Sequence, residues 1–147
     1  MHVTDEDLCE LTRNTCESML GLPLQSAEEC SLSAPNVAAS VRISGEWNAI
    51  VQVGGSESTA RKIASAMFSQ PAEDLSNTDI MDAFAEIANM VGGNVKGMFD
   101  GECQLSLPCV DNDADLSQWR GSDPAPQWFL LADEPLGVRL LELATTA

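Results

Sequence analysis

The sequence has little positive charge, a single histidine and no long apolar run. Seven Lys and Arg residues stand against 23 Asp and Glu residues, so the formal net charge is −16. This balance argues against nucleic acid and anionic membrane surfaces as partners, because their phosphates would repel the chain. No run of about 18 apolar residues occurs, so no membrane insertion is expected. The single histidine, His2, lies at the N-terminus and leaves little room for histidine-dependent catalysis.

The five cysteines are an odd number at irregular spacing, which is a poor disulfide framework. Cys9 and Cys16 are seven positions apart, so they share a face if their segment is helical. No CxxC pair or histidine cluster accompanies them. Two small buried residues are therefore a better interpretation than a metal or redox site, and we expect no metal site in this chain.

Length and patterning predict one α+β domain over residues 1–147, with a mostly antiparallel sheet packed with helices. The acidic start of the chain does not fit a secretory signal peptide, so a cytoplasmic location is expected. Capping signals and apolar periodicity predict helices over about 5–20, 56–68 and 76–99. Alternating apolar residues predict strands at 37–44, 47–53, 103–110, 127–132 and 138–143, with a loop or irregular strand at 24–36, a loop at 111–126 and a turn at 133–137.

The segment DAFAEIANMVGGN, residues 82–94, combines a polar face with two adjacent glycines inside a predicted helix. Asp82, Glu86 and Asn89 stand at i, i+4 and i+7, so they lie on one face, away from the apolar stripe. A glycine inside a helix costs about 1 kcal/mol relative to alanine, so the pair needs a reason. Tight packing of the helix on a neighbour and close approach of a partner to its backbone both remain open.

This string resembles the signature of the CheC/CheX/FliY phosphatases of bacterial chemotaxis, which remove phosphate from the response regulator CheY. The family pattern is an acid or serine, then Glu, then Asn, with a proline downstream in a strand. Asp82, Glu86 and Asn89 match it, and the string LSLP, ending at Pro108, supplies the proline. Glu10 in the first predicted helix is followed three positions later by arginine instead of asparagine, so the signature occurs once. A single copy is similar to CheX, and the order of elements matches over nearly the whole chain.

The resemblance implies a CheC/CheX-like fold and a catalytic pair on the 76–99 helix. Asn89 would orient the attacking water, and Glu86 would pair with the regulator's lysine. Asp82, Gly93 and Asn94 would contact the partner, a phosphorylated CheY-like response regulator that supplies its own Mg²⁺. No cofactor of the chain's own is then needed, and a homodimer is implied. The alternative is a non-catalytic CheX-like module that docks a response regulator or a flagellar motor component.

Two other motifs have simpler interpretations. The string DNDAD at 111–115 resembles the start of a calcium loop, but Leu116 stands where glycine is needed and Ser122 where glutamate is needed. A solvated acidic loop is therefore predicted. The string GGS at 54–56 precedes a helix but lacks the Lys-Ser/Thr of a phosphate-binding loop, so a turn and a helix cap are predicted.

Overall fold

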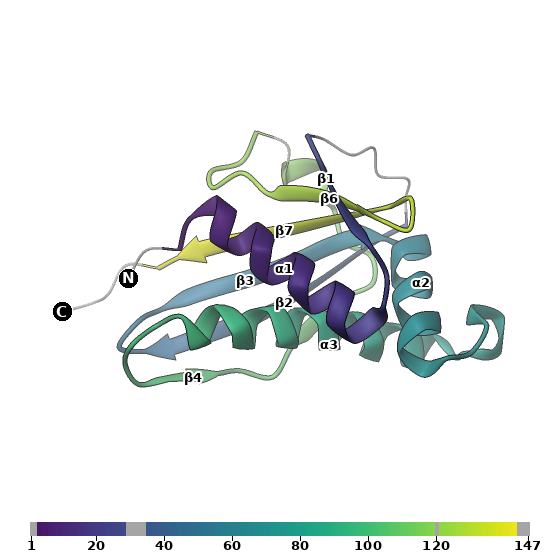
Figure 1. The fold of residues 1–147 in the computed structure, drawn as a ribbon, viewed down its shortest axis with the longest axis horizontal. Coiled ribbons are helices and arrows are strands. Elements are labelled where there is room, and N and C mark those ends of the chain that lie inside the picture. The colour runs from purple at the N-terminus through teal and green to yellow at the C-terminus, as the bar shows by residue number, and fades with distance from the viewer. Residues whose placement is uncertain (1–2, 29–34, 120, 144–147) are drawn as a thin grey trace.

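The computed structural model of the chain is a β-sheet with three helices packed on one face (Figure 1). The structure describes residues 3–28, 35–119 and 121–143. Its helices are α1 (Asp5–Leu20), α2 (Glu57–Phe68) and α3 (Asn77–Gly97), with short 3₁₀ helices η1 (Ala72–Asp74) and η2 (Ser117–Trp119). Its strands are β1 (Leu24–Ala27), β2 (Asn36–Gly45), β3 (Ala49–Ser56), β4 (Cys103–Leu105), β5 (Cys109–Asp111), β6 (Gln127–Leu131) and β7 (Glu134–Glu142).

The seven strands form one sheet in the order β1-β6-β7-β3-β2-β4, and β5 also pairs with β2. Every pair is antiparallel, which confirms the predicted α+β class. Helix α1 packs across β1, β6 and β7, whereas α3 packs on β2 through β5 (Figure 1). Among the described residues, no helix has the length and apolar character that a membrane span requires.

Local sequence signals explain where the helices begin. Thr4, Ser56 and Ser76 each accept a hydrogen bond from the backbone N–H three residues later, and each receives the reciprocal side-chain contact of a capping box. These caps confirm the predicted starts of all three helices. The alternating residues of β2 on the helical side of the sheet are buried, and they form the core together with the apolar faces of the helices: Val37, Ala39, Val41 and Ile43.

The stretch predicted as one strand over 103–110 is split in two. β4 pairs Leu105 with Ile43, and β5 pairs Cys109 with Ser40. The segment between these pairs is one residue longer on the outer strand than on β2, which makes a β-bulge. Pro108 lies in this bulge because it has no N–H to donate to the ladder.

The prediction of a turn over 133–137 was wrong for most of that range. Ala132 and Asp133 alone make the hairpin turn, with φ values of 47° and 70°, and β7 begins at the next residue. Two residues with positive φ suit the twist of a two-residue hairpin. The prediction relied on Pro135 and Gly137, which lie in β7. Gly137 leaves room there for the ring of Trp128, because a Cβ at this position would lie 2.7 Å from that ring.

The loop before β6 is anchored on the sheet face opposite the helices. Trp119 is buried, lies 6.0 Å from Trp128 between ring centroids and carries the Arg139 guanidinium 5.6 Å from its own centroid. A Cβ on Gly54 would stand 2.9 Å from the Trp119 ring, so this glycine lies in β3 and leaves room for the loop instead of forming the predicted turn. The predicted irregular segment at 24–36 contains β1, and its residues 29–34 lie outside the described residues.

Candidate functional site

Helix α3 carries the predicted site, and packing fixes the face that it turns outward. Ser76 caps its first turn, with the Asp79 N–H donating to Ser76 Oγ at 3.1 Å. The buried residues form a broad stripe toward the sheet and the other helices: Ile80, Ala83, Phe84, Ala85, Ile87, Ala88, Val91, Gly92 and Val95. A helix buried on this side presents its remaining positions to a partner.

The three signature residues lie on that outward face. Asp82 and Glu86 are exposed and Asn89 is half-buried. Within the described part of the chain, no hydrogen bond or ion pair engages their side chains. Glu86 and Asn89 are separated by a rise of about 4.5 Å along the helix, so one pocket on a partner can receive both. The structure therefore brings the predicted pair together, with both side chains free to bind.

The adjacent glycines of α3 have different surroundings. A Cβ on Gly92 would overlap Val41 Cγ2, so this glycine allows α3 to lie close to β2. A Cβ on Gly93 would meet Leu105 Cδ2 at 3.9 Å, which is ordinary contact, and one on Gly97 would meet nothing within 4 Å. Packing therefore explains Gly92. Gly93 and Gly97 keep the helix surface low on the face that carries Asn89.

Asn94 links two helices in addition to lying at the surface. Its Nδ2 donates to Thr15 Oγ1 on α1 at 2.9 Å, and the Thr15 hydroxyl donates to the Leu11 carbonyl at 2.8 Å. Thr15 is buried, so this short chain of hydrogen bonds fixes α1 beside α3. The amide nitrogen of Asn94 is engaged in this contact, which leaves its carbonyl oxygen for any partner.

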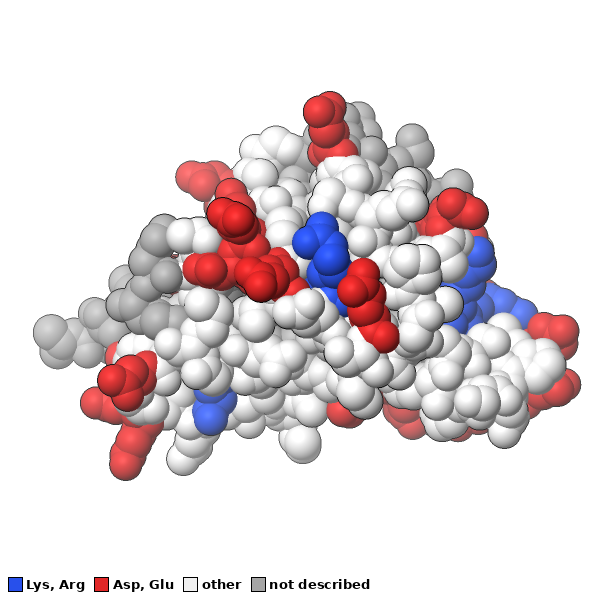
Figure 2. All heavy atoms as spheres, in the orientation of Figure 1, with Lys and Arg blue, Asp and Glu red and all other residues white. Residues whose placement is uncertain are grey.

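Lys96 is a basic residue on the same helix face that sequence reasoning missed. It stands seven positions after Asn89, is half-buried, and forms no ion pair with the described residues. The same spacing rule that grouped the signature residues could have found it. It is notable because acidic groups outnumber basic ones over the surface seen in Figure 2.

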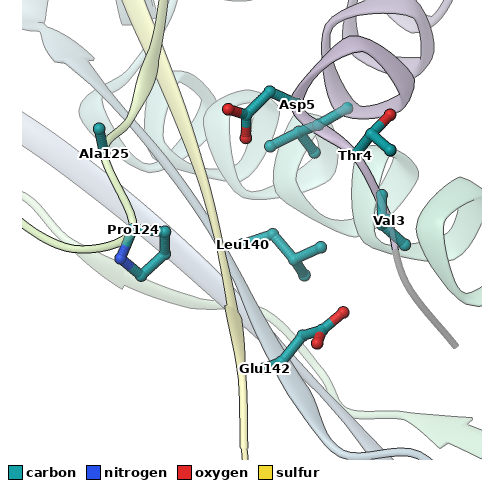
Figure 3. Close-up of a pocket in the computed structure, with 8 residues that line it drawn as sticks. Val3, Thr4, Asp5, Pro124, Ala125, Leu140 and Glu142 are labelled. Carbon is teal, nitrogen blue, oxygen red and sulfur yellow. The ribbon is translucent and has the colours of Figure 1, made fainter.

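A separate cavity of about 300 Å³ lies between the start of α1 and β7 (Figure 3). Leu8 and Leu140 are among the apolar residues that line it, and Asp5 and Glu142 contribute carboxylates. These carboxylates lie on different sides of the Leu140 side chain and do not converge. None of the lining residues belongs to α3. Across residues 3–28, 35–119 and 121–143, no group of three His, Cys, Asp or Glu residues is placed to hold a metal ion.

Comparison with known proteins identifies the family of the chain. The family model "Chemotaxis phosphatase CheX" matches residues 37–125, which is more than half of the chain. CheX from Vibrio vulnificus has a similar structure, with a TM-score of 0.73 at 13% identity over 97% of this chain and 99% of that one. The CheX–CheY–BeF3–Mg²⁺ complex from Borrelia burgdorferi gives a TM-score of 0.74 at 15% identity over 97% and 100%. No curated protein gives a significant sequence match. On the family match, the chain belongs to the chemotaxis phosphatase CheX family.

Proposed function

We propose that this protein hydrolyses the aspartyl phosphate of a CheY-like response regulator, with Glu86 and Asn89 as its catalytic pair. The observation that carries the proposal is the position of both side chains on one outward face of a well-packed helix, Glu86 exposed and Asn89 half-buried, with no internal partner in the described structure. Family membership gives the reaction class, and the Borrelia burgdorferi CheX–CheY complex is a precedent for the partner.

Asn89 supplies the water-positioning group. Its side-chain amide both donates and accepts hydrogen bonds, so it can hold a water in line with the phosphorus. The water oxygen forms the new bond to phosphorus while the bond to the aspartyl oxygen breaks. The products are inorganic phosphate and the regulator's free carboxylate. No covalent intermediate forms on this protein.

Glu86 fixes the geometry of the complex in this proposal. One helical turn from Asn89, its carboxylate pairs with the regulator's lysine in a charge-assisted hydrogen bond. The regulator brings the Mg²⁺ of its own phosphorylation site, so the chain needs no cofactor of its own. Asp82, Gly93 and the free oxygen of Asn94 are proposed as surrounding partner contacts. A homodimer and a cytoplasmic location belong to the same proposal.

Charge repulsion is the main obstacle to this docking, because the chain carries a net charge of −16 and the phosphorylation site of a regulator is itself acidic. The metal and lysine of that site offset Glu86 locally. Lys96 adds a positive charge on the chain's side, two helical turns from Asn89. The two acidic surfaces can therefore bind each other, because positive charges lie near the reacting groups on both sides.

The test is the release of inorganic phosphate from a phosphorylated CheY-like receiver of the same genome, with and without this protein. The proposal predicts faster release that scales with the concentration of the protein. Binding of the receiver without acceleration would contradict it and support the non-catalytic docking module. If the protein binds no receiver but binds a flagellar motor component, it would be a non-catalytic module that docks the motor.

A further inference from the structure

Leu107 is the most exposed large apolar side chain that the structure describes. It is 87% exposed, whereas Met19, Phe68, Met98 and Val110 are between 37% and 56% exposed. Single exposed leucines are common on protein surfaces and need no function of their own. Two further features, its fixed backbone and its place beside α3, make this one informative.

The backbone around Leu107 is held in place on both sides. The Arg42 N–H donates to Ser106 Oγ at 2.8 Å, and the Ser106 N–H donates to the Arg42 carbonyl at 2.9 Å. Pro108 then restricts the chain, and pairing with β2 resumes at Cys109. The bulge thus holds an exposed apolar side chain on a fixed support, so little conformational entropy is lost when a partner covers it.

The bulge lies beside the helix turn that follows Asn89. Leu105, two residues before Leu107, contacts the Gly93 position, and β4 runs alongside α3 in Figure 1. Two residues of extended chain span at most about 7 Å, so Leu107 lies within that distance of Leu105 and close to this helix face. Gly93 adds no side chain between Asn89 and the bulge, so the surface there is recessed beside the exposed Leu107 side chain.

A partner that receives Asn89 in a pocket must also cover the recessed surface between Asn89 and the bulge. A stable protein interface buries about 800 Å² on each side, which corresponds to a patch of about 16 Å in radius. The Asn89 side chain reaches only a few ångströms beyond the helix, so the partner's surface has to lie directly on α3. Leu107 falls inside such a patch.

We propose that Leu107 is an apolar docking contact for the phosphorylated receiver domain, presented by the Ser106–Pro108 bulge. This inference rests on the proposed function, since it places the same partner on the same helix. The bulge contributes affinity and takes no part in the chemical step, which belongs to Glu86 and Asn89. Removal of the side chain should therefore raise Kd and KM and leave kcat unchanged.

The test compares the wild-type protein, Leu107→Ala and the control Phe68→Ala, which removes an exposed apolar side chain at the end of α2. Two quantities are measured: Kd for a CheY-like receiver loaded with BeF3 and Mg²⁺, and kcat and KM for the phosphorylated receiver. Leu107→Ala should raise Kd and KM about tenfold with kcat within twofold. Phe68→Ala should change neither. Thermal unfolding checks that each variant is folded.

The outcomes separate this inference from the proposed function. If the wild type hydrolyses the phosphoryl group and Leu107→Ala keeps its Kd and KM, the docking role is overturned and the phosphatase stands. If Leu107→Ala lowers self-association and spares receiver binding, the leucine serves a second copy of the chain and the inference is again overturned. If the wild type binds the receiver through Leu107 without hydrolysis, the docking contact stands and the phosphatase proposal falls.

Discussion

The backbone of Gly92 lies against Val41, so closely that a Cβ on the glycine would overlap Val41 Cγ2. The neighbouring Gly93 has no such contact. Gly92→Ala should therefore lower the free energy of unfolding by about 1–3 kcal/mol through overpacking, despite the better helix propensity of alanine. Gly93→Ala should raise it by up to about 1 kcal/mol. Urea unfolding of the two variants checks both signs, and equal stability of the two would contradict this view of the helix–sheet contact.

Glu86 should matter more than its surface position suggests. A hydrogen bond to a charged group contributes about 1.5–3 kcal/mol net, so Glu86→Gln should lower kcat/KM for the phosphorylated receiver about ten- to a hundredfold. Glu73→Gln, which neutralises an exposed carboxylate on η1, is the matched control and should stay within twofold. Equal effects of the two changes would mean that net charge alone, without a specific lysine partner, governs the reaction.

Lys96 should assist the encounter of this acidic chain with the acidic phosphorylation site of a receiver. Lys96→Gln is expected to lower the association rate constant for the BeF3-loaded receiver about two- to fivefold at low salt. The difference should shrink at about 0.5 M salt, since screening weakens exposed charges. Arg61→Gln on α2 changes the net charge equally and should have the smaller effect. Stopped-flow binding at two salt concentrations decides between local attraction and the overall charge.

The structure assigns the cysteines different reactivities. Burial raises the pKa of the Cys16 thiol to about 12, whereas Cys109 is exposed. A thiol reagent at pH 8 should label Cys109 quickly and Cys16 only after unfolding, because the thiolate is the reacting form. The Cys16 thiol keeps its proton in the folded state above pH 9, where the unfolded thiol loses it. Its contribution to stability is therefore complete below pH 9 and falls as the pH rises toward 12. Mass spectrometry of the labelled peptides checks that Cys109 reacts before Cys16.

Sequence reasoning succeeded where the cause is local. Ser76 begins α3 because its hydroxyl caps the nearby Asp79 N–H, and the same periodicity that buries Phe84 turns Glu86 outward. These interactions involve residues within two helical turns. The family signature could be placed on an exposed helix face for the same reason.

Sequence reasoning could not decide where the cause is distant or a matter of register, as for the adjacent glycines, for which helix packing and partner approach both stayed open. The reason for Gly92 lies in β2, far along the chain, and the amide of Asn94 binds Thr15 on α1. The bulge at Pro108 shifts the strand register by one residue, which alternation of apolar residues does not reveal. The Ala132–Asp133 turn contains neither glycine nor proline, so the nearby proline and glycine drew the prediction away from it.

In the proposed mechanism Asn89 acts on the attacking water and contributes little to binding. The most direct measurement compares the wild type and Asn89→Ala in two assays: the single-turnover rate constant for loss of phosphate from the receiver, and Kd for the BeF3-loaded receiver. Asn89→Ala should have a rate constant at least about a hundredfold lower with Kd within about threefold, since one positioned hydrogen-bonding group is lost from the transition state. Equal rate constants for the two proteins, or a loss of rate explained wholly by weaker binding, would contradict it.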